Sequence, residues 1–100
     1  MNMLNSLILE GVVASEPHYL ETSNKTEFVI DNTRYSKNSL GEEVTEHYLF
    51  DAVAFSKCPH LLKKGDGVRV VGRIKQETWE DNGVSHSKVY IVVEHIEIRK

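Results

Sequence analysis

The segment GVRVVGRIKQETWEDNGVSHSKVYIVVEHIEI, residues 67–98, decides the fold of this chain. Its first half alternates apolar and polar residues, which is the two-residue period of a β-strand with two different faces. The tripeptide DNG at 81–83 interrupts the pattern, and Asn-Gly supplies the positive φ angles that a tight turn needs. We therefore predict strands at 67–80 and 85–98, joined as a hairpin.

The rest of the chain is also rich in short, β-prone segments. Further strands are predicted at 5–13, 26–35 and 44–55. Residues 56–66 have no strand character. Pro59 can begin a single helical turn that runs through Leu62, and Gly65 can end it.

Five strands with a short helix between the third and the fourth are the element order of an OB-fold, a five-stranded Greek-key barrel. Gly11 and Gly72 lie in the middle of strands, where a small closed barrel bends sharply and leaves no room for side chains. An SH3-like barrel has comparable strands but normally lacks the helix. We predict an all-β OB-fold that forms one domain over residues 1–100.

Composition excludes several classes of protein. The chain has a net charge of −3, five histidines and one cysteine, so no disulfide can form within it. The single cysteine predicts a reducing, cytoplasmic location. The chain lacks an apolar run of membrane-spanning length and a signal-peptide pattern at its start, so we expect no membrane partner. No histidines pair at metal-binding spacing, and no glycine-rich phosphate loop is present. We expect no metal, no cofactor and no catalytic residues.

The strand at 67–80 carries an unusual stripe. Arg69, Arg73, Lys75 and Trp79 occupy odd positions, so all four side chains should point to the outer face of the barrel. Cations beside an exposed ring suit single-stranded nucleic acid, because phosphates pair with the cations and bases stack on the ring. The alternative is ordinary solvated charge, which also blocks pairing of strand edges.

Four segments in the correct order resemble the bacterial-type single-stranded DNA-binding proteins (SSBs). They are MLNSLILEGVVASEP (3–17), FVIDNTRYSK (28–37), FDAVAFSK (50–57) and LLKKGDGVRVVGRIKQETWEDNG (61–83). The last segment is the most similar, with its Leu-Lys-Lys-Gly turn, its strand and a tryptophan before the hairpin. Such proteins wrap single-stranded DNA around their outer surface and stack bases on a few aromatic side chains.

The resemblance assigns roles to particular side chains. The proposed base-stacking residues are Tyr35, Phe55 and Trp79. The proposed phosphate contacts, which rest on charge and facing more than on the motif, are Arg34, Lys57, Arg69, Arg73 and Lys75.

The sequence departs from the family pattern in three ways. Leu49 occupies the position where strand three should carry another ring. Asp31, Glu77 and Glu80 place negative charge close to the proposed path and should weaken phosphate binding. The sequence ends at Lys100 without the acidic tail that recruits replication and repair proteins, so such partners are not assigned.

The resemblance implies a non-enzymatic, sequence-tolerant protein that coats single-stranded DNA in replication, recombination and repair. It also implies a homo-oligomer, with a tetramer favoured over a dimer. Leu7, Ile8 and Leu9 are consistent with this because they make the first strand apolar on both faces. Two alternatives stay open, namely a primosomal adaptor that acts mainly through protein contacts, and an RNA-binding OB domain.

Overall fold

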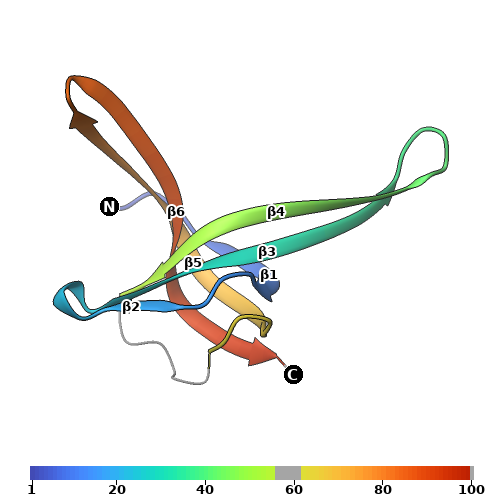
Figure 1. Cartoon of the computed structure of the whole chain (residues 1–100), viewed down its shortest axis with the longest axis horizontal. Coiled ribbons are helices and arrows are strands. Elements are labelled where there is room, and N and C mark those ends of the chain that lie inside the picture. Colours follow the sequence, from blue (N-terminus) through green and yellow to red (C-terminus); the bar gives the residue numbers. More distant parts are fainter. Residues whose placement is uncertain (56–61, 100) are drawn as a thin grey trace.

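The computed structural model describes residues 1–55 and 62–99, which form one twisted sheet closed into a barrel (Figure 1). The strands are β1 (Leu7–Val13), β2 (His18–Leu20), β3 (Lys25–Lys37), β4 (Glu43–Ala54), β5 (Gly67–Asp81) and β6 (Val84–Arg99). One 3₁₀ turn, η1 (Glu21–Ser23), separates β2 from β3.

Strand pairing confirms the predicted OB-fold. The strand order is β1-β5-β6-β4-β3-β2, and β1 also pairs with β3, opposite Ile30 and Asp31, which closes the five-stranded barrel. β4 and β6 run parallel at Ala52–Ala54, and the other pairings are antiparallel. Mixed parallel and antiparallel pairing arises because strands that are neighbours in this barrel are not always consecutive in the sequence.

All five predicted strands are present, and the hairpin between β5 and β6 turns at Asn82 and Gly83, both with positive φ. The sequence analysis missed β2 and η1, because three residues are too few to show a period. The predicted helical turn at Pro59–Leu62 falls on residues 56–61, outside the described residues, apart from Leu62, which is not helical. In the part of the chain that is described, the single helical element is η1.

The core fills the barrel with branched apolar side chains. Ile30 and Val70 are fully buried, and Val13 and Val68 are 1% exposed. The two mid-strand glycines lie where the backbones approach closely, as predicted. A Cβ on Gly72 would lie 2.1 Å from the carbonyl oxygen of Val92, closer than any side chain can tolerate.

β6 contains a bulge where it passes β5. Val71 pairs with His95 and Gly72 pairs with Val93, so Glu94 has no partner opposite it. A bulge bends its strand and increases the local twist. The bend falls beside the close contact at Gly72, where the barrel wall turns.

Two hairpins continue beyond the barrel as arms. We call β3–β4 the first arm and β5–β6 the second arm; they leave the barrel in different directions (Figure 1). Every residue from 73 to 89 is exposed, so the outer part of the second arm contributes nothing to the core. The radius of gyration is 15.8 Å, compared with about 13 Å for a compact domain of this size.

The segment before β1 is tied to β5 by a side chain. The Asn5 amide nitrogen donates to the Ile74 carbonyl oxygen at 2.7 Å, and the Ile74 N–H donates to the Asn5 amide oxygen at 3.0 Å. The amide thereby acts as one more peptide group and continues the β1–β5 ladder past Leu7. In the described residues, no helix has the length and apolarity needed to cross a membrane.

Candidate nucleic-acid interface

The outer face of the second arm contains most of the predicted stripe. Alternation along β5 places Arg73, Lys75 and Trp79 on one face of the hairpin, as expected. Arg69 lies lower on the same strand, between the buried residues Val68 and Val70, and it too faces outward. The stripe is therefore one continuous face that runs from the barrel wall towards the turn.

Trp79 is 46% exposed near the end of this arm. Its ring stacks on that of His86 from β6, with centroids 5.6 Å apart and planes 22° apart. This is the offset arrangement that paired rings prefer. Both residues border a hollow of about 360 Å³, and the exposure of the indole gives a flat ligand access to it.

Phe55 lies at the base of the same arm, directly after β4, and is 50% exposed. The Lys75 ammonium nitrogen is 5.9 Å from the centre of its ring, at the outer limit of a cation–π contact. The fold therefore brings together one predicted stacking ring and one predicted phosphate contact from strands that are distant in sequence.

Tyr35 and Arg34 lie on the first arm, near its turn. Tyr35 is 79% exposed and borders a hollow of about 390 Å³. Within residues 1–55 and 62–99, no carboxylate is at ion-pair distance from Arg34. Because the arms diverge (Figure 1), the structure does not place Tyr35 beside Trp79.

The predicted cations of the second arm are paired with acids. Arg69 is 3.2 Å from Glu10, which also binds Arg99. Exposed ion pairs of this kind are each worth about 0–1 kcal/mol, so a phosphate can replace the carboxylate at little cost. Lys57, also predicted to contact phosphate, lies outside the described residues.

Two looser ion pairs complete this set. Arg73 is 3.9 Å from Glu94, the bulged residue of β6, and Lys75 is 4.0 Å from Glu77. These distances are at the limit of direct contact, so both cations are more available to a phosphate than Arg69 is.

The acids expected to weaken binding are held by neighbouring side chains. His47 and Thr33 both contact the Asp31 carboxylate, with the His47 Nδ1 3.0 Å from Oδ2. Alternation along β5 places Glu80 on the opposite face from Trp79. Its charge is therefore directed away from the stripe.

Glu77 is the third of these acids. Its Oε1 accepts a hydrogen bond of 2.6 Å from the hydroxyl of Tyr90. Burial, followed by this hydrogen bond, raises the pKa of Tyr90 to about 12. Tyr90 is therefore a buried anchor of the arm and not a base platform.

Leu49 is 64% exposed but has no ring. The β3–β4 register is regular through this region, with Asp31 opposite Leu49 and Ile30 opposite Phe50. Without a bulge, Tyr48 and Phe50 point to the other face and cannot take its place. The Tyr48 hydroxyl donates to Glu46, which raises the pKa of Tyr48.

The sequence analysis missed two residues of the stripe face. His86 lies opposite Trp79, and Lys88 lies opposite Glu77. The signal was present, because a two-residue turn at Asn82-Gly83 fixes which residues of the two strands face each other. Counting outward from the turn places both side chains on this face.

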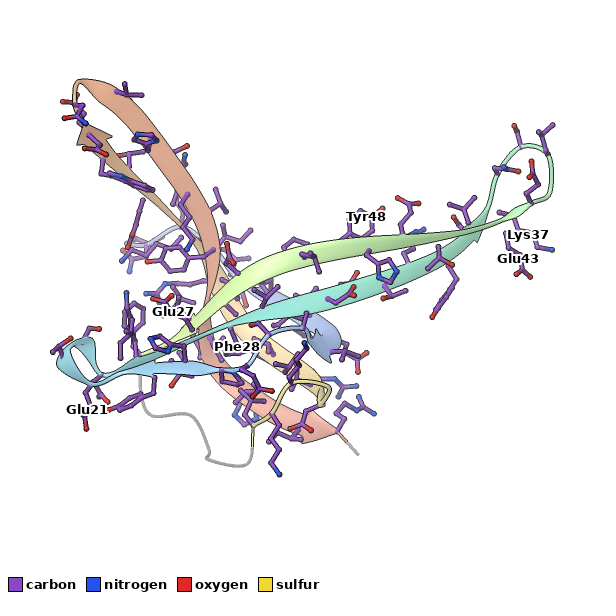
Figure 2. The ribbon with its side chains drawn as sticks, viewed as in Figure 1. Glu21, Glu27, Phe28, Lys37, Glu43 and Tyr48 are labelled. Atoms are coloured by element: carbon purple, nitrogen blue, oxygen red, sulfur yellow. The ribbon has the colours of Figure 1, made fainter. Side chains whose placement is uncertain are left out.

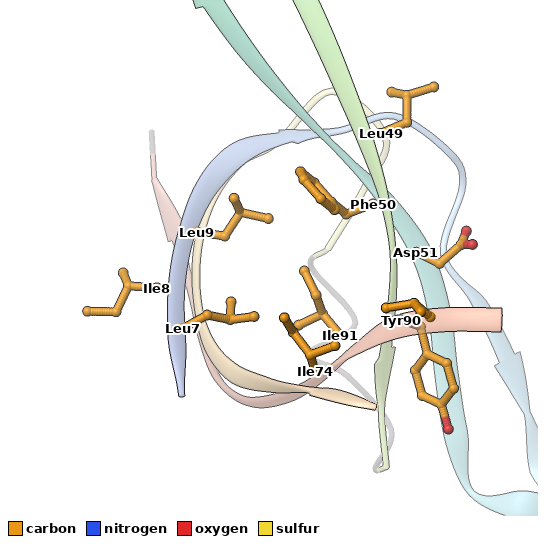
Figure 3. Close-up of a pocket in the computed structure, with 10 residues that line it drawn as sticks. Leu7, Ile8, Leu9, Leu49, Phe50, Asp51, Ile74, Tyr90 and Ile91 are labelled. Atoms are coloured by element: carbon orange, nitrogen blue, oxygen red, sulfur yellow. The ribbon is translucent and has the colours of Figure 1, made fainter. Parts of the chain in front are cut away.

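An apolar groove of about 380 Å³ lies between β1 and the bases of the arms (Figure 3). Leu7, Leu9, Phe50 and Ile74 point into it, whereas Ile8 points away and is 71% exposed. Among the described residues, no cluster of His, Cys, Asp or Glu could hold a metal ion.

The fold and this surface define a class of protein, an OB barrel whose outer face carries exposed rings among cations. The chain belongs to the single-strand binding protein family, whose model matches residues 4–99. Proteins of this family are not enzymes. The family therefore agrees with a surface made for binding.

Two relatives support this membership. The chain is 34% identical over 103 residues to the single-stranded DNA-binding protein of Aquifex aeolicus (strain VF5), covering 96% of this chain and 70% of that one. It is 36% identical over 104 residues to the single-stranded DNA-binding protein of Borreliella burgdorferi, covering 95% of this chain and 69% of that one.

Solved structures share the fold at lower identity. A Plasmodium falciparum SSB in complex with ssDNA has a TM-score of 0.83 at 18% identity, covering 100% of this chain and 98% of that one. The small single-stranded DNA-binding protein of Streptomyces coelicolor has a TM-score of 0.73 at 23% identity, with coverage of 99% and 96%.

Proposed function

We propose that this chain, as a single domain over residues 1–100, binds single-stranded DNA without sequence preference and coats exposed strands. Family membership supports the ligand. The observation that carries the proposal is the line formed by Phe55, Lys75 and Trp79, where exposed rings and a cation follow one face of an arm. Bases stack on such rings regardless of sequence, while the cations neutralise the backbone.

The proposed path uses both arms. Stacking would occur at Trp79 and Phe55 on one side of the barrel and at Tyr35 on the other. Phosphates would contact Arg34, Arg73 and Lys75, which are the more available cations, and Arg69 after exchange from its carboxylate. Lys57 is also proposed as a phosphate contact. Coating of this kind serves replication, recombination and repair, and a cytoplasmic location fits the single cysteine of the chain.

The first test is a titration with oligo(dT) across a salt series, followed by the emission of Trp79, the one tryptophan of the chain. Stacking should quench the emission, and log affinity should fall with log salt by about 0.7 per phosphate neutralised. An unchanged emission together with no salt-dependent binding would refute the proposal.

The matched test is Trp79→Ala, measured by anisotropy of a labelled oligonucleotide. Loss of one stacked base should weaken binding by about 1–3 kcal/mol. Val84→Ala is the control, because Val84 is an exposed apolar residue of the same hairpin without a ring. Equal affinities of the two variants would contradict the stacking role. Competition by a matched RNA oligonucleotide tests the preference for DNA.

We also propose that the chain assembles into a homo-oligomer, a tetramer, through copies of β1. Among the described residues, β1 pairs on the side away from β5 only with β3, at Val12 and Val13, and the edge at Leu7–Leu9 has no strand beside it. An open strand edge beside exposed apolar side chains, here Ile8 and the groove, is suited to antiparallel pairing with a second copy around a twofold axis.

The test of assembly is the mass in solution by sedimentation. Ile8→Lys should dissociate β1-paired copies, whereas Leu40→Lys, an equally exposed apolar site at the turn of the first arm, should not. A monomeric wild-type chain would overturn this part of the proposal without affecting DNA binding.

A further inference from the structure

We propose that His86 is the second ring of the stacking platform, and that it positions the indole of Trp79 and adds a pH-dependent positive charge to the DNA path. This inference rests on the proposed function and names a residue that the family pattern of rings and cations did not include. The observation that supports it is the cross-strand pair of Trp79 and His86, whose rings stack on each other.

The geometry makes the two rings one unit. Trp79 and His86 lie directly opposite each other, and their rings stack at 5.6 Å and 22°. The imidazole therefore covers one face of the indole and leaves the other face for a base. An exposed tryptophan with no neighbour would exchange between rotamers, and fixing it in advance lowers the entropy cost of binding.

The exposure of the indole suits a flat ligand. Trp79 and His86 also border a hollow of about 360 Å³ at the end of the arm, together with hydroxyl and carboxylate residues. Its lining residues are Thr78, Trp79, Glu80, Ser85, His86 and Ser87. Alternation directs the side chains of the four polar residues to the other face of the hairpin, so a base on the open indole face would meet the indole, which is 46% exposed.

The charges near His86 determine what its protonation does. On the same face, β5 places Glu77 and Asp81 two residues before and after Trp79, and β6 places Lys88 two residues after His86. Glu77 is hydrogen-bonded to Tyr90, and the Lys88 ammonium is directed to Asp51, 4.0 Å away. A proton on the imidazole therefore adds a cation to the path close to the bound base.

Histidine is the side chain that changes charge between about pH 5 and pH 8. Protonation of His86 should strengthen the contact with phosphate, and an imidazolium over an indole is also a favourable cation–π pair. Affinity for single-stranded DNA should therefore rise as the pH falls through this range, with Trp79 remaining stacked.

The test compares wild type, His86→Ala, His86→Phe and the control His95→Ala, an exposed histidine near the other end of β6. Affinity for labelled oligo(dT) is measured at about pH 5.5 and pH 8. His86→Ala should bind roughly fivefold more weakly at pH 8, and by a larger factor at about pH 5.5, because it lacks the added cation as well as the ring. His86→Phe should restore the affinity at pH 8 and lose the gain at low pH, while His95→Ala behaves as wild type.

A DNA-free measurement separates this inference from the proposed function. The emission of Trp79 in the free protein should change with pH in wild type and stay constant in His86→Phe. A constant emission in wild type would overturn the ring contact, whatever the DNA results.

The binding data have two further outcomes that overturn the inference. Unaltered affinity of His86→Ala at both pH values, with Trp79→Ala weakened, would leave the proposed function intact and remove His86 from the platform. Failure of His86→Phe to restore binding at pH 8 would show that a ring at this position does not position the indole.

Discussion

Replacing Gly72 by alanine should strongly destabilise the barrel. A β-carbon there would lie 2.1 Å from the carbonyl oxygen of Val92 and 3.3 Å from the Ile91 Cγ2 atom. Contact with backbone cannot be relieved by a rotamer change, so β5 and β6 must separate by about 1 Å beside the bulge. Where there is room for its side chain, alanine stabilises a strand relative to glycine by about 0.5–1 kcal/mol. A loss of stability in Gly72→Ala would therefore indicate the close contact and not a general effect of alanine.

The magnitude follows from what the separation disrupts. Overpacking costs about 1–3 kcal/mol, and each weakened ladder hydrogen bond adds about 0.5–1.5 kcal/mol. After subtraction of the alanine gain, we expect Gly72→Ala to lose about 2–4 kcal/mol of unfolding free energy. Its midpoint temperature should fall by roughly 10–20 °C in a domain of this size.

The assay is urea unfolding followed by far-UV circular dichroism, at one protein concentration because the proposed assembly would contribute to stability. Gly67→Ala is the control on the same strand, since its nearest contact would be the Arg99 carbonyl oxygen at 3.3 Å, at the end of the ladder. It should remain within about 1 kcal/mol of wild type. Equal stability of Gly72→Ala and wild type would refute the close-approach argument.

Three more predictions concern the arms and the first strand. Burial and a hydrogen-bonded carboxylate raise the pKa of Tyr90 from 10.0 to about 12, so the unfolding free energy that this residue contributes below pH 10 should be lost as the pH rises towards 12. In chemical unfolding, Tyr90→Phe should show a smaller loss over this range. A pH profile identical to that of wild type would contradict the assignment. Arg73→Gln should lower the slope of log affinity against log salt by about 0.7. Arg69→Gln should lower it by less, since that guanidinium already has a close carboxylate, and equal reductions would argue against this ranking. Asn5→Ala should lower the unfolding free energy by about 1–2 kcal/mol and speed hydrogen exchange at the Ile74 amide, which donates to Asn5. Unchanged protection of that amide would disprove the proposed extension of the β1–β5 ladder by the Asn5 side chain.

The barrel could be predicted well because the patterns that define its strands and turns lie within short segments of the sequence. Alternation along β5 and the Asn82-Gly83 turn define a hairpin without reference to the rest of the chain, and Gly72 marks a close contact that only glycine fits. β2 was missed because three residues show no period, and its strand character comes from pairing with β3.

The site was less predictable because it depends on pairs of residues. The exposure of Trp79, Phe55 and Tyr35 agrees with the sequence analysis, but the acid beside each cation does not follow from strand alternation. Arg69 meets Glu10 only because β1 lies next to β5 in the barrel, which is a long-range pairing. Figure 2 shows charged side chains on both strands of the first arm, among them Lys37 on β3 and Glu43 on β4 near the turn.

The second arm is exposed along both strands from residue 73 to residue 89, and this has a consequence for how such a surface can change. Adding two residues to each strand would move the turn outward by about 7 Å and keep every side chain on its face. Adding one would exchange the two faces beyond the insertion and direct the indole away from the proposed DNA path. The reach of the arm is therefore adjustable in fixed steps that leave the barrel untouched, so related chains can space their rings differently on one unchanged core.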